Sequence, residues 1–203
     1  MVLWALPVMA AVILHEIAHG LVAYWRGDPT AQRAGRLTLN PLPHIDPVGT
    51  LLLPALLIAA HSPFLFGYAR PVPVNFRNLY RPQRDMVLVA AAGPATNLLL
   101  AALSALLLRV VAVPDLPVAE QGPLAAMALR SVLINVVLAI FNLVPIPPLD
   151  GGRVLAGLLP LRQAVAFSRV EPYGMFIVVA LLATDVLGRV VGPVVDVVLR
   201  VLL

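Results

Sequence analysis

The chain alternates between long apolar stretches and shorter polar segments that are rich in arginine and proline. A membrane-spanning helix needs about 20 predominantly apolar residues, because the hydrocarbon core of a bilayer is about 30 Å thick. Four of the stretches are about that long or longer. The pattern therefore predicts an all-α polytopic membrane protein with about four transmembrane helices, at 2–26, 86–111, 124–144 and 173–200.

A fifth apolar segment, 48–66, is shorter and is interrupted by Pro54 and Pro63. Proline removes a backbone donor and clashes with the preceding helical turn, so a full spanning helix is not expected here. The segment is predicted to be a short span or a re-entrant membrane element. Small β-like elements are predicted near the active site: 36–40 as a short strand, and 71–75 as an extended loop or an edge strand.

The composition agrees with a membrane location. Of the 203 residues, 61% are hydrophobic and 12% are charged, and the mean hydropathy is +0.95. A soluble domain has about 45–50% apolar and about 25% charged residues, and a chain this short cannot bury the excess in one core. These values exclude a soluble enzyme. We expect one membrane-embedded domain over 1–203, without repeats or a second soluble domain.

All 14 cationic side chains are arginines, and the formal net charge is +4. The arginines lie between apolar stretches, so orientation in the membrane explains them better than nucleic-acid binding does. Segments 26–46, 67–85 and 152–170 are basic, whereas 112–123 is acidic. Because cytoplasmic loops carry the excess of arginine, the three basic segments are predicted to be cytoplasmic. This orientation requires 48–66 to enter and leave the membrane on one side.

One short motif in the first apolar stretch carries ionisable side chains: His15, Glu16 and His19 form an HExxH sequence. Residues four apart share one face of a helix, so both imidazoles can bind one metal ion, and the adjacent glutamate can take a proton from metal-bound water. Ionisable groups inside a spanning helix are costly and usually functional. The alternative is three polar side chains that pack against neighbouring helices. These residues, with no basic segment before them, also make a cleavable signal peptide unexpected.

The third metal ligand is predicted to be Asp150. Catalytic zinc takes three protein ligands and keeps one position open for water. The chain has no cysteine, so its ligands must come from His, Asp or Glu. His44 and His61 lie outside the predicted spans, whereas Asp150 follows a helix that is broken by prolines at 145, 147 and 148. Asp150 could instead cap the helix predicted at 151–159, or do both.

Three motifs together resemble the site-2 protease family of intramembrane zinc metalloproteases. They occur in the family's order and cover most of the unusual polar residues. The motifs are His15-Glu-Ile-Ala-His19, Gly93-Pro-Ala-Thr-Asn97 and Asn142…Pro145-x-Pro147-x-Leu149-Asp150-Gly151.

The resemblance implies a role for each matching residue. The family's ligands to one zinc ion correspond to His15, His19 and Asp150, and its catalytic glutamate corresponds to Glu16. Asn142 matches a family asparagine that acts on the substrate or the oxyanion, and Asn97 matches the asparagine of the family's central helix. The resemblance therefore makes both of them candidate catalytic residues. The chain resembles compact bacterial members without a PDZ or CBS domain.

We therefore expect an intramembrane zinc metalloendopeptidase that cleaves transmembrane segments of membrane proteins, without nucleic-acid partners. A bacterial cytoplasmic membrane, with the active site towards the cytoplasmic side, fits the compact chain. Two alternatives are a zinc-binding membrane transporter and a catalytically silent membrane scaffold. His44 is interpreted as a solvated loop histidine, with a place at the mouth of the active site as the alternative. The substrate and the oligomeric state are left open.

Overall fold

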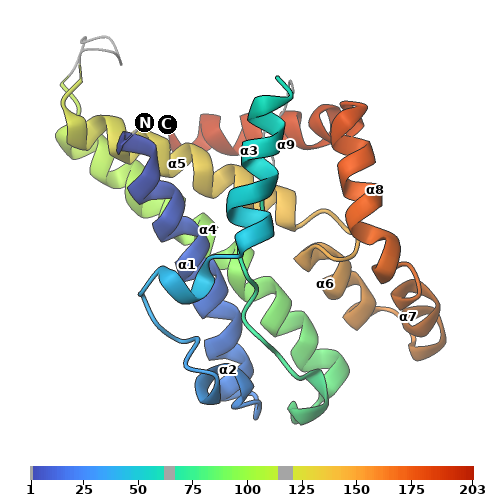
Figure 1. The fold of residues 1–203 in the computed structure, drawn as a ribbon. Helices are drawn as coiled ribbons and strands as arrows, with labels where there is room; N and C mark the ends of the chain where they lie inside the picture. Colours follow the sequence, from blue (N-terminus) through green and yellow to red (C-terminus); the bar gives the residue numbers. More distant parts are fainter. Residues whose placement is uncertain (1, 62–66, 114–120) are drawn as a thin grey trace.

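The computed structural model describes residues 2–61, 67–113 and 121–203, and the regular secondary structure in these ranges is entirely helical. The order of elements along the chain is shown in Figure 1. The helices are α1 (Val2–Trp25), α2 (Thr30–Arg33), η1 (Leu42–His44), η2 (Pro47–Leu52), α3 (Leu53–Ala59), η3 (Phe76–Asn78), α4 (Pro82–Val111), α5 (Pro123–Asn142), α6 (Asp150–Leu158), α7 (Leu161–Ser168), α8 (Glu171–Ala183) and α9 (Val186–Leu202).

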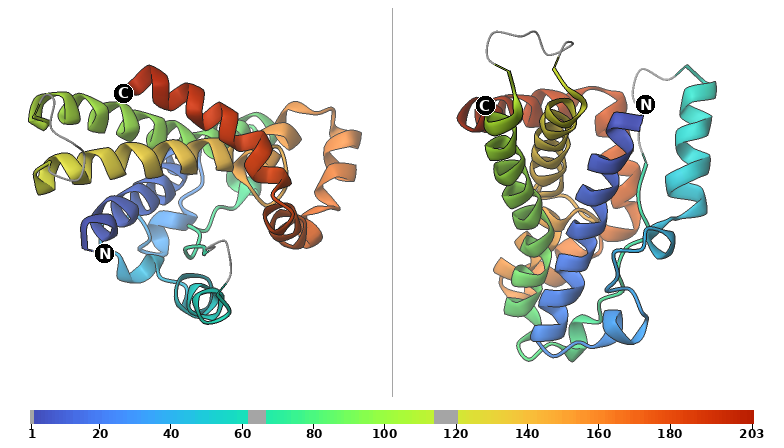
Figure 2. Two further views of the ribbon diagram at one scale, coloured as in Figure 1. Left: turned by 90° about the horizontal axis from the view of Figure 1, so that it is seen from above. Right: turned by 90° about the vertical axis from the view of Figure 1, so that its left-hand side faces the viewer.

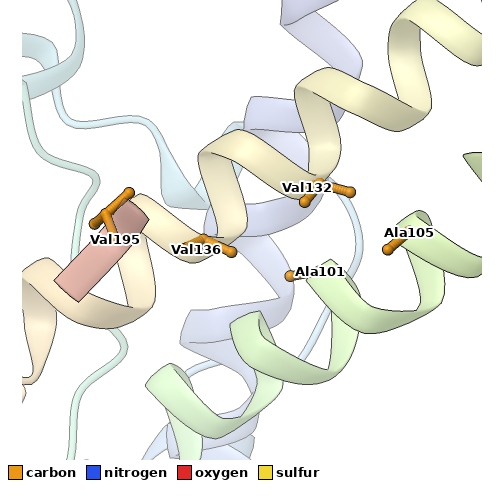
Figure 3. Packing of buried hydrophobic residues seen from close by; sticks show 5 residues of the cluster. All are labelled: Ala101, Ala105, Val132, Val136 and Val195. Carbon is orange, nitrogen blue, oxygen red and sulfur yellow. The ribbon is translucent and has the colours of Figure 1, made fainter. Parts of the chain in front are cut away.

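Helices α1, α4 and α5 form the centre of the molecule and pack against one another (Figure 1). All three are long and apolar enough to cross a membrane, and these candidate spans coincide with the first three predicted ones. Small buried side chains let α4 and α5 approach closely. Figure 3 shows Ala101 and Ala105 of α4 next to Val132 and Val136 of α5, with Val195 of α9 completing the cluster.

The fourth predicted span, a single helix over 173–200, is wrong. Helix α8 ends at Ala183 and α9 starts at Val186. Between them, Asp185 has a left-handed backbone with φ +58°, a conformation that aspartate tolerates better than most residues. Helix α9 then turns back and packs across α5 instead of continuing α8 (Figure 2). The pair that could form a fourth span is α7 with α8, two helices bent by 64°.

The described part of the 48–66 segment is a short apolar helix over Pro47–Ala59, and 62–66 lie outside the described residues. The backbone N–H of Tyr68 donates to the carbonyl of Gly49 at 3.1 Å. The chain therefore comes back to the point from which this helix started. That return favours a re-entrant element over a span, as the charge pattern requires.

The predicted β-like elements are absent from the described residues, which contain no strand. Residues 71–75 are extended but lie outside any sheet. Pro71 and Pro73 have no backbone N–H, so this segment cannot form a regular ladder of hydrogen bonds. Its fixed shape comes instead from side chains that bind its backbone, as described below.

The arginine-rich segments gather at one end of the molecule. In Figure 1, α2, the start of α4 and α7 lie at the lower end, opposite the end of α4 and the start of α5. The charge-based orientation predicts this arrangement. Arg109 and Arg200, in the last turns of α4 and α9, lie away from this basic end, so the bias of arginines is strong but incomplete.

Candidate active site

Helices α1 and α6 bring three candidate metal ligands together. The Nε2 atoms of His15 and His19 are 3.0 Å apart, and Oδ2 of Asp150 lies 3.1 Å from the first and 3.3 Å from the second. All three residues are buried. In the part of the chain that the structure describes, they form the only group of three or more such side chains close enough to hold one metal ion.

The other ring nitrogens fix how these imidazoles are protonated. Nδ1 of His15 lies 2.5 Å from Oδ1 of Asn97, and Nδ1 of His19 lies 2.7 Å from the carbonyl oxygen of Val89. A carbonyl oxygen only accepts hydrogen bonds, so each Nδ1 must donate one and carry the proton. Both Nε2 atoms then present lone pairs, which is the form that binds a metal.

The arrangement fits a cation. Two nitrogen lone pairs and one carboxylate oxygen point at a common space, and they repel one another unless a positive charge lies between them. Oδ2 of Asp150 is buried and has no hydrogen-bond partner among the described residues. Two imidazole nitrogens and one carboxylate oxygen are a donor set of catalytic zinc sites, which keep a fourth position for water. The residues present therefore fit a zinc ion.

Gly93 of α4 leaves the space that this site needs. A Cβ atom added there would lie 2.6 Å from Nε2 of His15 and closer still to Nε2 of His19. Carbon and nitrogen atoms that are not bonded normally stay about 3.5 Å apart. A larger residue at this position would therefore occupy the space on which the three ligands converge.

Two glycines let α6 place Asp150 next to α1. A Cβ on Gly151 would overlap the carbonyl group of Leu143, and a Cβ on Gly152 would lie 2.6 Å from the nitrogen of Pro147. The start of α6 therefore packs directly on the proline-rich turn after α5. Asp150 is the first residue of α6 and follows the N-cap position, which Leu149 occupies. Its carboxylate faces the histidines, so the capping alternative is wrong.

Glu16 lies next to the three ligands but is not one of them. It is half-buried, and its Oε2 accepts a hydrogen bond of 2.7 Å from the backbone N–H of Val72. Arg36 holds the residues just before Val72, because its Nη2 donates to the carbonyl of Arg70 at 2.7 Å. In the described part of the chain, the second carboxylate oxygen of Glu16 has no hydrogen bond, so it is available to exchange a proton.

The two candidate asparagines have different surroundings. Asn97 is completely buried and binds the ring of His15, a place that suits orientation of a ligand better than contact with a substrate. Asn142 is half-buried at the end of α5, and its Nδ2 donates to the carbonyl of Leu138 at 2.9 Å. In the described residues, Asn142 makes no hydrogen bond with His15, His19 or Asp150.

The sequence-based interpretation of His44 as a solvated loop residue is wrong. His44 is 4% exposed, and its Nε2 lies 3.0 Å from the carbonyl of Thr38. Its own carbonyl accepts a hydrogen bond of 2.9 Å from the N–H of Arg70, the residue that Arg36 also binds. His44 therefore helps to fix the loop that leads to Val72.

Asp28 anchors the far end of the same loop. It is fully buried, and it accepts hydrogen bonds from Thr30, from the N–H of Asn75 at 2.7 Å and from the amide of Asn78 at 2.8 Å. Burial alone would raise the pKa of Asp28, but these hydrogen bonds outweigh it and lower the pKa below its usual value. Asp28 and Arg36 thus hold the 71–75 segment from both sides.

The sequence does not reveal the roles of four further residues at the site: Gly93, Val72, Arg36 and the buried Asn135. Gly93 belongs to a motif that indicates the family but not the close packing of this glycine against the histidines. Arg36 resembles the other arginines of the polar loops. Asn135 gave a usable signal, because a polar residue within an apolar helix is costly and usually has a partner. Its partner, Asn97, is apparent only once α4 and α5 are placed side by side.

Comparison with known proteins shows the family of the chain. The family described as peptidase family M50 matches residues 109–184. The chain is 38% identical over 190 residues to "Putative zinc metalloprotease YwhC" of Bacillus subtilis, covering 93% of this chain and 83% of that protein. It is 34% identical over 181 residues to "Putative zinc metalloprotease Rip2" of Mycolicibacterium smegmatis, covering 89% of this chain and 66% of that protein. No solved structure matches. The chain therefore belongs to peptidase family M50, the site-2 protease family that its three motifs resemble.

Proposed function

We propose that this protein is an intramembrane zinc metalloendopeptidase that cuts transmembrane segments of other membrane proteins. The observation that carries the proposal is the convergence of His15, His19 and Asp150 beside Glu16. This group lies among helices that are long and apolar enough to span a bilayer. A hydrolytic site placed there would meet peptide bonds that soluble proteases cannot reach.

His15, His19 and Asp150 would hold the zinc ion. Bound zinc polarises the scissile carbonyl and lowers the pKa of a bound water molecule. As the oxygen of a water molecule bonds to the scissile carbonyl carbon, Glu16 would take up that water's proton on its free carboxylate oxygen. It would pass the proton to the amine that leaves when the C–N bond breaks. The Val72 N–H, which binds the other oxygen at 2.7 Å, would keep the carboxylate in place during this exchange.

Two further residues are assigned to the site on their positions. Asn97 would keep the ring of His15 in its ligating form, through the hydrogen bond of 2.5 Å. Asn142 would bind the substrate or the developing oxyanion with its amide. Its amide nitrogen has two N–H donors, and only one of them is used by the carbonyl of Leu138, at 2.9 Å.

A helical substrate must be unwound before cleavage, because its backbone groups are paired within the helix. Residues 71–75 belong to no helix or strand, the backbone of Asn75 is extended, and the Val72 N–H binds Glu16. An unwound substrate would lie along this segment and pair with its free backbone groups. Pro71 and Pro73 have no N–H, and the N–H groups of Val72 and Asn75 already bind Glu16 and Asp28. We therefore expect the segment to guide the substrate and not to bind it tightly.

The protein is an integral membrane protein with several apolar helices. We place it in a bacterial cytoplasmic membrane, as a single domain over 1–203 with the active site towards the cytoplasmic side. The arginine-rich end of the molecule supports this orientation, and His15 and His19 lie in the half of α1 that leads to that end. Water would reach the ligands from the same side.

Neither alternative function is favoured. A zinc transporter needs successive ligand groups along a path, and the described residues contain one such group. A silent scaffold has no use for a glutamate fixed next to a metal site.

The test uses purified protein in lipid vesicles together with a set of tagged single-span test proteins. Wild type is compared with Glu16→Gln and with Glu171→Gln, a matched change at an exposed glutamate of α8. We expect zinc in all three proteins and cleavage by wild type and Glu171→Gln alone. Equal cleavage by Glu16→Gln would contradict the role of Glu16, and bound zinc without cleavage of any test protein would contradict the protease function.

A further inference from the structure

A second asparagine lies behind Asn97, inside the contact between α4 and α5. Asn135 is 1% exposed and belongs to none of the three motifs that identify the family. Its Oδ1 accepts a hydrogen bond of 2.7 Å from Nδ2 of Asn97, and its own Nδ2 donates to the carbonyl of Ser131 at 2.8 Å. A continuous chain of hydrogen bonds therefore runs from the backbone of α5 to the ring of His15.

The direction of this chain is fixed at its far end. The carbonyl of Ser131 only accepts, so the amide nitrogen of Asn135 must face it and the amide oxygen of Asn135 must face Asn97. Asn97 must then turn its nitrogen towards Asn135 and its oxygen towards His15. Since that oxygen only accepts, the proton of His15 stays on Nδ1 and the lone pair stays on Nε2.

We propose that Asn135 is a positioning residue for the metal site and acts on His15 through Asn97. Without Asn135, the amide of Asn97 would keep one anchor, the carbonyl of Ala11 at 3.2 Å. An amide that is held less firmly can flip and present its nitrogen to Nδ1 of His15. His15 would then carry its proton on Nε2, the atom that faces Asp150, and could not bind a metal there.

A purely structural role for Asn135 predicts a different result. Polar side chains between membrane helices often act only as links between those helices. The hydroxyl of Ser104 is such a link, because it donates to the hydroxyl of Ser131 at 2.7 Å and joins the same two helices. Ser104 meets the path only at its far end, because the hydroxyl of Ser131 also accepts a hydrogen bond of 3.2 Å from Nδ2 of Asn135. The shorter bond from that amide to the carbonyl of Ser131 does not depend on Ser104. Ser104→Ala is therefore a matched control that weakens the helix contact while leaving the bond that orients Asn135 in place.

The inference rests on the proposed zinc site, and its test measures zinc binding without a substrate. The dissociation constant for zinc is measured by competition with a chelator, on the protein over residues 1–203 in detergent micelles. Five proteins are compared with wild type: Asn135→Ala, Asn135→Ser, Asn97→Ala, the Asn97→Ala and Asn135→Ala double variant, and Ser104→Ala. Thermal unfolding of each metal-free protein reports on stability separately. The Ser variant keeps an oxygen near Asn97 and is the milder change.

Residues that orient a metal ligand typically contribute 10-fold to 100-fold to metal affinity. We expect Asn135→Ala to raise the dissociation constant by at least 10-fold, Asn135→Ser by less, and Ser104→Ala by under about threefold. In the Asn97→Ala background, Asn135→Ala should add less than about threefold, because its route to His15 is already broken.

Each other result has a definite meaning. The inference would be overturned if the loss of zinc affinity paralleled the loss of thermal stability across the variants, with Ser104→Ala lowering zinc affinity as much as Asn135→Ala does. A full additive effect of Asn135→Ala in the double variant, or no effect in a folded Asn135→Ala or Asn135→Ser protein, would also overturn it. Wild-type protein that binds no zinc would instead refute the metal site, and so the proposed function itself.

Discussion

Replacing Gly93 with alanine should remove zinc while leaving the fold intact. In a helix, a change from glycine to alanine normally stabilises by roughly 0.5–1 kcal/mol, because glycine loses more conformational freedom on folding. At Gly93 the new methyl group would lie 2.6 Å from Nε2 of His15 and 2.5 Å from Cε1 of the same ring. An ordinary separation is about 3.5 Å, so the ring must move by about 1 Å.

The ring of His15 cannot make that movement freely, because Asn97 holds its Nδ1 and Val89 holds the neighbouring His19. Metal–ligand distances tolerate errors of only about 0.2 Å. A displacement several times larger should lower zinc affinity by at least 100-fold, which corresponds to about 2.7 kcal/mol. This loss of zinc-binding free energy is larger than the gain in helix stability, so the variant should fold and bind zinc poorly.

The assay is zinc affinity by chelator competition, with the thermal unfolding of the metal-free protein measured alongside. Gly192→Ala is the matched control, since it is the same change in helix α9 and its methyl group would meet nothing within 4 Å. We expect Gly192→Ala to bind zinc as wild type does. If Gly93→Ala bound zinc with an affinity within threefold of wild type, the proposed position of the metal between His15, His19 and Gly93 would be refuted.

Three further predictions concern the surroundings of the site. Asp28→Asn should destabilise the protein by about 2 kcal/mol at neutral pH. Because the folded-state pKa of Asp28 is lowered, the stability difference between wild type and variant should shrink as the pH falls below about 4, as measured by thermal unfolding at several pH values. Arg36→Gln should leave zinc content unchanged but reduce cleavage about 10-fold or more, because it releases the segment that holds Glu16; unchanged cleavage would contradict this role. Asp185→Gly should be neutral or stabilise by up to about 1 kcal/mol in thermal unfolding, whereas clear destabilisation would argue against the left-handed break between α8 and α9.

The candidate metal ligands and three candidate spans are predictable from the sequence because they depend on local patterns. His15 and His19 are one helical turn apart, and Asp150 follows a run of prolines that marks the end of α5. Such signals need no knowledge of which helices are neighbours. The family resemblance rests on the same residues.

The remaining features depend on packing between distant segments. Gly93 and Asn135 acquire their roles only when α4 packs against both α1 and α5, and no local sequence pattern predicts that contact. His44 looked solvated because it lies in a polar loop, yet the loop folds back and buries it. The break at Asp185 was missed because the residues on both sides are apolar and their composition suits one long helix.

The most direct test of the central claim is the zinc content of wild type and Asp150→Ala, each purified with excess zinc and then passed through a desalting column. The structure predicts about one zinc ion per wild-type molecule, since catalytic sites of this type hold a single ion, and essentially none in Asp150→Ala. A folded Asp150→Ala protein that keeps its zinc, or a folded wild type that binds none, would contradict a metal site made by His15, His19 and Asp150.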